Sequence, residues 1–316
     1  MTAEQSDSTV SVCHSWSYPA VDESKNLMQG ELIFYVNGKK IVKCNPDPCL
    51  LLAQFLREEL KLTGTKIACD EGGCGSCTVI ISKFDRAAAN IVHCSANSCV
   101  TPVCLLHGLA VTTVEALGST KTKLHQIQEQ LVKCHGIQCG FCSPGMVMSL
   151  YALLRNNPHP LQLQVEQAFQ GNLCRCTGYR PILDAFKSFA TDVSVCPMGK
   201  HCCQNANSKE TVKSDCEASS AGLLPDNSQE LIFPNELQLT DVYDKQSLMF
   251  GTEADVLWYR PSSLKQLLSL KAHYHHARLV SGLWSHYYRI QPENAYEAVC
   301  LYLNIWMHGA DYHEMQ

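Results

Sequence analysis

Three cysteines in one short stretch are the residues best suited to chemistry. Cys69, Cys74 and Cys77 follow the spacing C-x4-C-x2-C, with three glycines among them. This is the ligand spacing of plant-type [2Fe-2S] clusters, in which several thiolates converge on one inorganic core. Glycine reaches positive φ without a Cβ, so the backbone can curl closely around such a core. Zinc sites usually pair one C-x2-C with another and need no such glycines. The stretch therefore predicts an iron–sulfur site.

A [2Fe-2S] cluster needs a fourth thiolate, and three later cysteines are candidates. They are Cys94, Cys99 and Cys104. Spacing alone does not decide among them, although Cys99 follows the polar stretch 95–98 in the most turn-like context. The two that are not ligands are then ordinary small buried residues, as most free cysteines are.

A second group of cysteines stands in two further loops. Cys139 and Cys142 form C-x2-C, and Cys174 and Cys176 form C-x-C. The first pair precedes Ser143-Pro144, expected as N-cap and first residue of a helix, whose positive dipole end favours thiolate over thiol. Four thiolates from two loops could hold zinc or a second [2Fe-2S] cluster. A thioredoxin-type redox motif would need a βαβ context that the surrounding sequence lacks.

The residues around the first cysteines predict the elements that position them. Residues 31–36 and 40–42 are rich in β-formers and flank Asn37-Gly38, the strongest short-range hairpin signal. A helix with Leu52, Phe55, Leu56 and Leu60 on one face follows, and strands are expected at 78–82, 90–94 and 110–114. A hairpin, a helix and then the cysteine loop is the order of a β-grasp, ferredoxin-like domain, placed at residues 31–118.

From about Lys121 the pattern becomes helical. Four short amphipathic helices are expected over residues 119–190, a small bundle. Their apolar faces carry Leu124, Ile127 and Leu131; Val147, Leu150, Tyr151 and Leu154; Leu161, Val165 and Ala168; and Ile182, Ala185, Phe186 and Phe189. The fold class expected is thus α+β, a β-grasp domain followed by a four-helix domain with the second cysteine set at its helix ends.

Composition excludes several classes of protein. The 316-residue chain has a formal net charge of -5, a hydrophobic fraction of 46% and 19 cysteines. An acidic chain without a basic stripe is not expected to bind nucleic acid, and no stretch has the length of a membrane span. Residues 1–30 form a polar lead-in, expected to be flexible, and lack a signal-peptide pattern. So many cysteines without such a signal predict a reducing compartment, the cytoplasm.

Three stretches carry a family resemblance. They are DEGGCGSCTV at 70–79, QCGFCSPGM at 138–146 and GNLCRCTGYRP at 171–181. Together they resemble the molybdenum hydroxylases, the family of xanthine dehydrogenase and aldehyde oxidase. The match runs from about Glu31 to Ala190, and residues 124–125 and 133–136 favour the aldehyde oxidase branch. Gln170 departs from the family pattern, which usually has a second glycine there.

The resemblance implies two [2Fe-2S] clusters and a role for each cysteine set. It assigns Cys69, Cys74, Cys77 and Cys99 to the first cluster, and Cys139, Cys142, Cys174 and Cys176 to the second. Gln138 matches the family's glutamine that contacts molybdopterin, which another domain would hold. In such enzymes electrons pass from the molybdenum centre through the helical-domain cluster and the ferredoxin-like cluster to FAD.

Beyond Ala190 the resemblance becomes weaker. Residues 191–224 are expected to be a linker, and 225–282 resemble the start of the family's FAD domain, including a helix with Leu264, Leu267 and Leu268 on one face. After Gly282 the flavin pyrophosphate loop is not continued, so 283–316 form a divergent tail and FAD binding is doubtful. A metal site made of His273, His275, His276 and His286 is less expected than an adventitious tail, because no spacing unites them.

Two functions are therefore expected from the sequence. The first is a two-cluster electron-transfer portion of an aldehyde-oxidase-like oxidoreductase, without catalytic residues or substrate turnover of its own. The alternative is a truncated, non-catalytic product that acts as an interaction or dominant-negative fragment. In either case the expected partner is a full-length oxidase subunit, in a homo- or heterodimer, and not a nucleic acid or a membrane.

Overall fold

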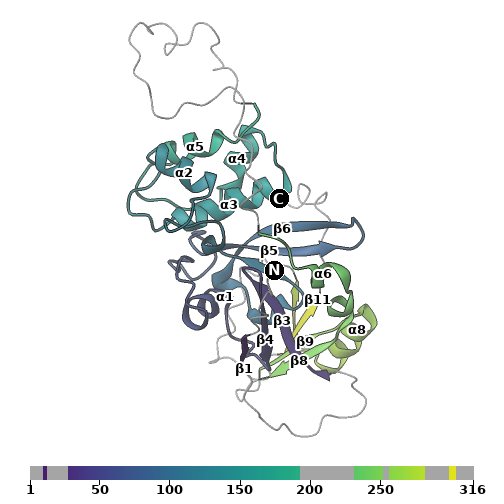
Figure 1. The fold of residues 1–316 in the computed structure, drawn as a ribbon. Helices are drawn as coiled ribbons and strands as arrows, with labels where there is room; N and C mark the ends of the chain where they lie inside the picture. Colours follow the sequence, from purple (N-terminus) through teal and green to yellow (C-terminus); the bar gives the residue numbers. More distant parts are fainter. Residues whose placement is uncertain (1–9, 13–27, 193–230, 252–255, 282–298, 304–316) are drawn as a thin grey trace, which may run out of the picture.

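The computed structural model describes residues 10–12, 28–192, 231–251, 256–281 and 299–303. Most of the expected lead-in, nearly all of the expected linker and most of the divergent tail lie outside the described residues. The described chain forms a sheet region with the first cysteines, a helical region with the second, and a third segment that begins at residue 231 (Figure 1).

The hairpin predicted around Asn37-Gly38 is confirmed. Strands β3 (Glu31–Val36) and β4 (Lys39–Cys44) pair in antiparallel register, with Val36 opposite Lys39. Both turn residues are left-handed, with φ of 50° at Asn37 and 78° at Gly38. That geometry matches the twist of the flanking strands, which is why Asn-Gly is favoured there.

The first sheet is mixed and six-stranded. Its order is β1-β4-β3-β7-β5-β6, with β1 (Val10–Val12), β5 (Thr78–Asp85), β6 (Asn90–Asn97) and β7 (Ala110–Thr112) completing it. The predicted helix is α1 (Leu52–Gln54) continued by a π-helical turn, Phe55–Glu59. Its apolar face packs against Leu32 and Phe34 of β3 in one core. Three short 3₁₀ turns span Ser98–Val100, Val103–Leu106 and Val114–Ala116.

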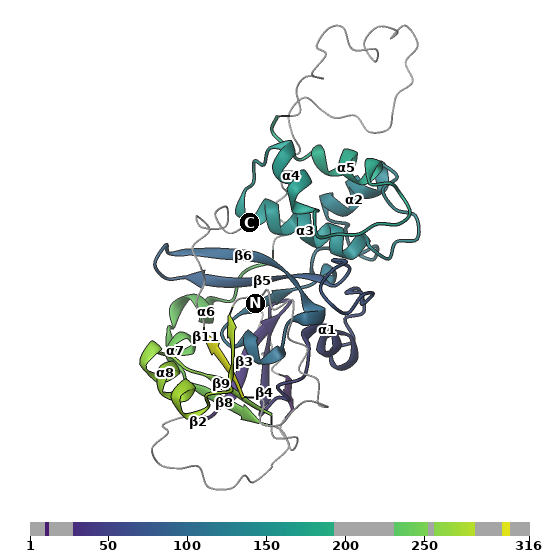
Figure 2. The ribbon, with the colours of Figure 1, turned by 180° about the vertical axis from the view of Figure 1, so that it is seen from behind.

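The helical region lies beyond the β5–β6 hairpin, in both views (Figures 1 and 2). It consists of α2 (Gln126–Lys133), α3 (Ser143–Asn156), α4 (Gln162–Ala168) and α5 (Arg180–Lys187). The central helix α3 packs on β5 and β6, and Ile80 of β5 belongs to the helical core. Phe169 and Phe186 stack inside this core, with ring centroids 4.8 Å apart.

One expectation for α3 is off by a residue. Cys142, not Ser143, is the N-cap, and Ser143 is already helical. The last cysteine of the C-x2-C pair therefore stands at the helix terminus itself, where the free amide groups and the positive end of the dipole are strongest.

The third segment adds a second sheet to the molecule. It contains α6 (Asn235–Leu239), α7 (Val242–Lys245), β8 (Leu248–Gly251), β9 (Leu257–Arg260), α8 (Leu264–His273) and β10 (Arg278–Ser281). With β2 (Met28–Gln29) and β11 (Val299–Leu303) these strands take the order β10-β11-β9-β8-β2. Leu248, Phe250, Trp258 and Val280 share one hydrophobic core with β3 and α1, so the two sheets are not separate bodies.

Two sequence expectations are corrected here, and one open point is decided. The flexible N-terminus at 1–30 contains two short strands, β1 (Val10–Val12), paired with β4, and β2 (Met28–Gln29), paired with β8. The sequence left open whether the divergent tail folds, and the structure places β11 (Val299–Leu303) there, parallel to both β10 and β9. Both were missed because a single short strand gains its stability from the sheet it joins, which local pattern does not reveal.

The second correction concerns the buried face of α8. The helix buries Leu267 and Leu270, while Leu264 and Leu268 are 64% and 59% exposed. The helix starts at the Ser263 N-cap, whose side chain accepts a hydrogen bond from the backbone amide of Gln266. Packing against Tyr259 and Ala277 buries the predicted Leu267 together with Leu270. No helix of the described residues is long and apolar enough to cross a membrane.

Candidate iron–sulfur sites

The first cysteine loop, residues 69–77, is built from left-handed backbone. Asp70, Gly72 and Gly75 have φ of 56°, 80° and 69°. Such conformations turn the chain tightly and leave inward-facing amides, the arrangement that backbone concavities use to hold anionic groups. The loop is anchored to β6, because Asn97 donates its side-chain amide to the carbonyl of Gly72 at 2.7 Å.

Four thiols meet at this loop in two pairs. Cys77 and Cys99 have their sulfurs 3.2 Å apart, and the Cys69 thiol is within hydrogen-bonding reach of Cys74. The hydrogen bond with Cys99 lowers the pKa of Cys77 to about 7 and raises that of Cys99. Ser98 holds Cys99 in place, since its amide and hydroxyl both donate to the carbonyl of Cys77.

The other two candidates for the fourth position lie elsewhere. In the β5–β6 register, Asn97 pairs with Thr78, next to Cys77, whereas Cys94 pairs with Ile81. Three residues along a strand amount to about 10 Å, and burial raises the pKa of Cys94 to about 11. Cys104 is fully buried in the core of the first sheet. Only Cys99 of the three is brought to the loop.

The second set of four cysteines also comes together in pairs. The sulfurs of Cys139 and Cys176 are 3.5 Å apart, and Cys142 is within hydrogen-bonding reach of Cys174. Burial, with the neighbouring Cys174 thiol, raises the pKa of Cys142 to about 12. Burial also acts to raise the pKa of Cys174, but the hydroxyl and amide of Thr177 outweigh it and lower that pKa.

The loop that carries Cys174 and Cys176 has its own internal support. Tyr179 and Gly178 are left-handed, with φ of 68° and 65°. This conformation turns the Tyr179 side chain back, so that its hydroxyl accepts a hydrogen bond from the amide of Cys174 at 2.9 Å. The C-x-C loop thus ends directly at α5, just as the C-x2-C loop ends at α3.

The paired approach of the thiols bears on what they could hold. A zinc ion needs four ligands around one point, whereas each iron of a [2Fe-2S] cluster takes two of the four thiolates. Within the described residues, no three or more His, Cys, Asp or Glu side chains are arranged around a single-ion position. His273, His275 and His276 accordingly form no such group, and His286 lies outside the described residues. Pairs of thiols fit a two-iron core better than a single ion.

The surface around the second set is open and carries apolar side chains. Cys139 and Cys176 are exposed, as is Gln138. Ile137, Phe141 and Leu173 beside them are 41%, 44% and 48% exposed. The first set lies deeper, with Cys77 and Cys99 each 1% exposed. The two sets therefore differ in how closely a partner could approach them.

Two hollows lie near the boundary between the sheet and the helical region. One, of about 470 Å³, opens beside Gly72 and Gly73 and is lined by amide side chains, including those of Asn97, Gln167 and Gln170. Gln170, the departure from the family pattern, thus lies on its wall.

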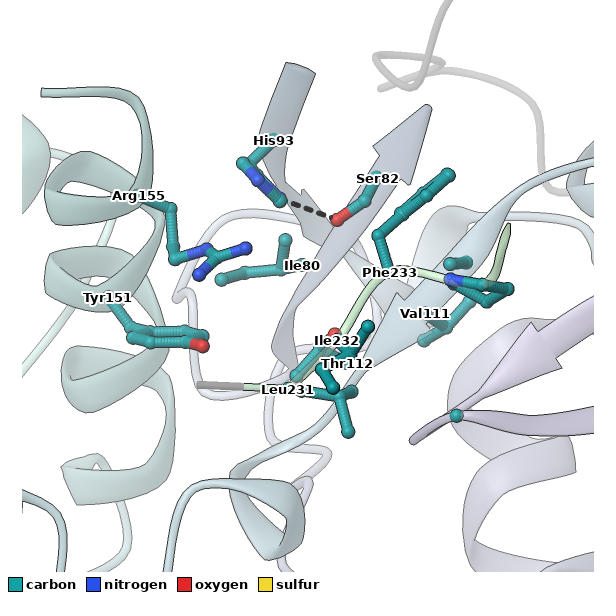
Figure 3. A pocket seen from close by; sticks show the side chains of 13 residues that line it. Ile80, Ser82, His93, Val111, Thr112, Tyr151, Arg155, Leu231, Ile232 and Phe233 are labelled. Carbon is teal, nitrogen blue, oxygen red and sulfur yellow. Dashed lines mark hydrogen bonds between the residues drawn. The ribbon is translucent and has the colours of Figure 1, made fainter. Parts of the chain in front are cut away.

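The other hollow is much smaller, about 20 Å³, and lies between β5, β6, α3 and residues 231–234 (Figure 3). In it Ser82 Oγ and His93 Nδ1 are 2.7 Å apart. A volume of that size holds about one water molecule. The Ser82–His93 pair is therefore a packing feature and not a substrate site.

Comparison with known proteins agrees with this geometry. Residues 34–104 match the "2Fe-2S iron-sulfur cluster binding domain", and residues 113–187 match the "[2Fe-2S] binding domain". Xanthine dehydrogenase of Drosophila subobscura is 53% identical over 259 residues, and aldehyde oxidase 1 of Bos taurus is 48% identical over 263 residues. The chain belongs to the xanthine dehydrogenase and aldehyde oxidase family. The two [2Fe-2S] domains of this family account for its sheet and helical regions.

These matches also set the extent of the family relationship. The alignments cover 79% and 80% of this chain but only 19% and 20% of those two relatives. Quinoline 2-oxidoreductase of Pseudomonas putida 86 contains a chain that is 38% identical, with a TM-score of 0.43, covering 52% of this chain and 92% of that one. The identities do not favour the aldehyde oxidase branch over the xanthine dehydrogenases, so the branch preference drawn from residues 124–125 and 133–136 finds no support.

Proposed function

We propose that the chain is the two-cluster electron-transfer portion of a molybdenum hydroxylase. Cys69, Cys74, Cys77 and Cys99 would hold the first cluster, and Cys139, Cys142, Cys174 and Cys176 the second. When bound, each cluster takes up and releases one electron at a time, which suits the coupling of two-electron centres such as flavin and molybdenum. The observation that carries the proposal is the gathering of eight thiols into two sets, each made of two pairs.

The chain's own residues supply binding, shielding and access. In the left-handed loop at 69–77 the backbone amide of Gly72 is within hydrogen-bonding reach of the Cys99 thiol. The N-terminus of α3 places the positive end of its dipole at Cys142. The first set is shielded by α1 and the turn at residue 98. The second set is exposed on one side, where we place the molybdopterin-holding domain of the intact enzyme, with Gln138 as the contact.

Iron analysis and the cysteine variants test this proposal directly. Anaerobically purified protein should contain about four irons per chain, two for each cluster, and give two distinct paramagnetic signals on reduction. Cys99→Ser should lose the first cluster's signal and about half of the iron, because neither Cys94 nor Cys104 reaches the loop. The matched controls Cys94→Ser and Cys104→Ser should keep both signals. Stoichiometric zinc in place of iron, or equal losses in all three variants, would refute the assignment.

Exposed apolar side chains favour a second candidate, an interaction fragment of the same family. On the third segment Ile232, Leu239 and Leu264 are 81%, 86% and 64% exposed. Large exposed apolar surface marks sites that another protein covers. As such a fragment the chain would bind a complete oxidase subunit and turn over no substrate itself.

Mixing the chain with a complete xanthine dehydrogenase or aldehyde oxidase tests this candidate. Sedimentation should show a mixed species, and Ile232→Asp with Leu239→Asp should abolish it while leaving the iron content intact. If no mixed species forms at micromolar concentration, this second candidate is refuted, while the electron-transfer proposal is unaffected.

A further inference from the structure

The two cysteine loops are in direct backbone contact. The amide of Leu173 donates a hydrogen bond to the carbonyl of Cys74 at 2.9 Å. Cys74 belongs to the first set, and Leu173 immediately precedes Cys174 of the second. A path of covalent bonds, interrupted by this single hydrogen bond, therefore joins a sulfur of one set to a sulfur of the other.

Glycines make this close approach possible. A Cβ on Gly75 would lie 2.4 Å from the carbonyl oxygen of Gly171, and a Cβ on Gly145 would lie 2.2 Å from the carbonyl oxygen of Gly75. Both distances are far below van der Waals contact. The first cysteine loop, the first turn of α3 and residues 171–172 are therefore packed backbone against backbone.

One side chain of residues 171–172 links α3 to the first cysteine loop. Asn172, 7% exposed, accepts a hydrogen bond from Ser149 Oγ of α3 at 2.8 Å. Its Nδ2 donates to the carbonyl of Gly75 at 3.1 Å and lies 3.4 Å from Thr78 Oγ1. The amide thus holds the helix with its oxygen and the first cysteine loop with its nitrogen.

We propose that Asn172 is a positioning residue that holds the two cluster loops in register and so sets the rate of electron exchange between them. The exchange moves one electron from the reduced cluster to the oxidised one and makes or breaks no bond. The inference rests on the proposed function, because it needs both clusters to be present. Without the Asn172 link, the Leu173–Cys74 hydrogen bond is the weakest step of the path and the first to lengthen.

Only an amide satisfies both sides of this contact. A carboxylate of the same shape would still accept from Ser149, but it has no hydrogen to donate and would face the carbonyl of Gly75. The Gly75 carbonyl would keep the hydrogen bonds from the hydroxyl and the amide of Thr78. It would face a negative oxygen in place of the Asn172 donor, and this repulsion disfavours the contact. Asn172→Asp therefore removes the link to the first loop and leaves the link to α3.

Asn156 provides a matched control. It too joins the helical region to the sheet through its amide, which accepts from the backbone amide of His93 at 3.1 Å and donates to the carbonyl of His93. Asn156 lies in the last turn of α3, whereas the cysteine loops lie beside the first turn of that helix. Asn156→Asp should weaken the attachment of the two regions in general without disturbing the cluster loops.

The experiment compares wild-type protein, Asn172→Asp and Asn156→Asp, each reconstituted with iron and sulfide. We expect Asn172→Asp to keep both clusters but to weaken the magnetic interaction between them in the fully reduced protein. It should also slow electron equilibration between the clusters several-fold and speed hydrogen exchange of the Leu173 amide. Asn156→Asp should leave all three quantities at wild-type values.

Each other result has a definite meaning. Unchanged interaction, rate and exchange in Asn172→Asp overturn the inference, and so do equal changes in the two variants. A wild-type chain that binds no iron instead refutes the proposed function. If Asn172→Asp fails to bind iron, the hydrogen-exchange rate of the Leu173 amide is compared between the iron-free variant and the iron-free wild type. A faster rate in the variant supports the inference, and an unchanged rate overturns it.

Discussion

At the scale of single residues, the first site depends on backbone that only a few residue types adopt. Gly75 has φ of 69° and lies against the second cysteine loop, so it is constrained both by conformation and by space. Gly73, two residues earlier, is not: a Cβ there would have its nearest neighbour at 3.8 Å. The site therefore requires glycine at position 75, whereas position 73 has room for a side chain.

We expect Gly75→Ala to lower the free energy of unfolding by about 1–3 kcal/mol or more, because a left-handed alanine is strained and its Cβ meets backbone. Iron retention should fall in parallel. Gly73→Ala should change neither quantity measurably. Denaturant unfolding and iron analysis of the two variants provide the measurement, and equal effects in both would contradict this account.

A second residue-scale expectation concerns pH. Burial, together with the charge of Arg155, lowers the pKa of His93 to about 4, against about 6.5 when unfolded. The folded state thus binds fewer protons between these values, so the stability due to neutral His93 is fully present above about pH 6.5 and is lost as pH falls toward 4. We expect His93→Gln to remove about 2 kcal/mol of the decline in unfolding free energy between pH 7 and pH 5.

Denaturant unfolding at the two pH values measures this difference. The contacts of Asn156 with position 93 involve only backbone atoms, so they survive the substitution. Loss of the hydrogen bond with Ser82 changes the unfolding free energy by the same amount at both pH values, so it does not affect the decline between them. If the unfolding free energy declines equally between pH 7 and pH 5 in His93→Gln and the wild type, the lowered pKa of His93 is refuted.

At the scale of elements, the third segment is fastened to the first sheet by its first two helices. Glu236 of α6 accepts hydrogen bonds from Lys40 at 2.8 Å and from the hydroxyls of Tyr35 and Tyr243. Burial opposes the charge of Glu236, but these donors outweigh it and lower its pKa to about 2. Phe233, Leu237 and Tyr243 cover Tyr35 and Ala110 beneath them.

Arg86, just after β5, closes the other end of α6. Its guanidinium donates to the carbonyls of Leu237 and Gln238, each at 3.1 Å, and to that of Thr240, and it pairs with Asp244 at 2.6 Å. These are carbonyls that the helix end leaves without intrahelical partners. One side chain therefore satisfies the last turn of α6 and holds α7 beside it.

We expect Arg86→Ala to speed amide hydrogen exchange in α6 and α7 by an amount equivalent to about 1.5–3 kcal/mol, the range for hydrogen bonds to a charged group. Exchange in β3 and β4 should not change. Lys245→Ala is the control, since its pair with Asp241 is a solvent-exposed i,i+4 contact that contributes little to stability. Uniform acceleration throughout the chain would show that Arg86 acts on global stability instead.

At the scale of the whole molecule, the third segment is part of the core and not an appendage. Trp258 is fully buried in the same cluster as Leu32 and Phe34. The side chain of Asn45, whose φ is 43°, pairs with both backbone groups of Gly251 and ties the second sheet to β4. Stability of the ferredoxin-like region should therefore depend on residues far along the chain.

We expect Trp258→Ala to lower the free energy of unfolding of the first sheet by about 3–5 kcal/mol, the usual range for a buried tryptophan. The first cluster should be lost at a correspondingly lower denaturant concentration. Leu268→Ala, on the exposed face of α8, should stay within about 0.5 kcal/mol of the wild type. If the first sheet unfolds at the same midpoint in both variants, the two sheets are energetically independent.

The sequence by itself determined the local chemistry of this protein. The spacing of Cys69, Cys74 and Cys77 predicted a [2Fe-2S] site, and Asn37-Gly38 predicted the hairpin, because both depend on interactions within a few residues. The resemblance carried by the three motifs supplied Cys99 and the two-domain order.

Only the tertiary structure decided which segments far apart in the sequence contact one another. The β5–β6 register brought Cys99 and not Cys94 to the loop, and the packing of Tyr259 and Ala277 chose which leucines of α8 are buried. The link from Asn172 to Gly75 spans almost a hundred residues of sequence, and so does not appear in any local pattern. Hydrogen bonds and packing between such segments exist only once the chain has folded, which is why residue types and spacing alone did not reveal them.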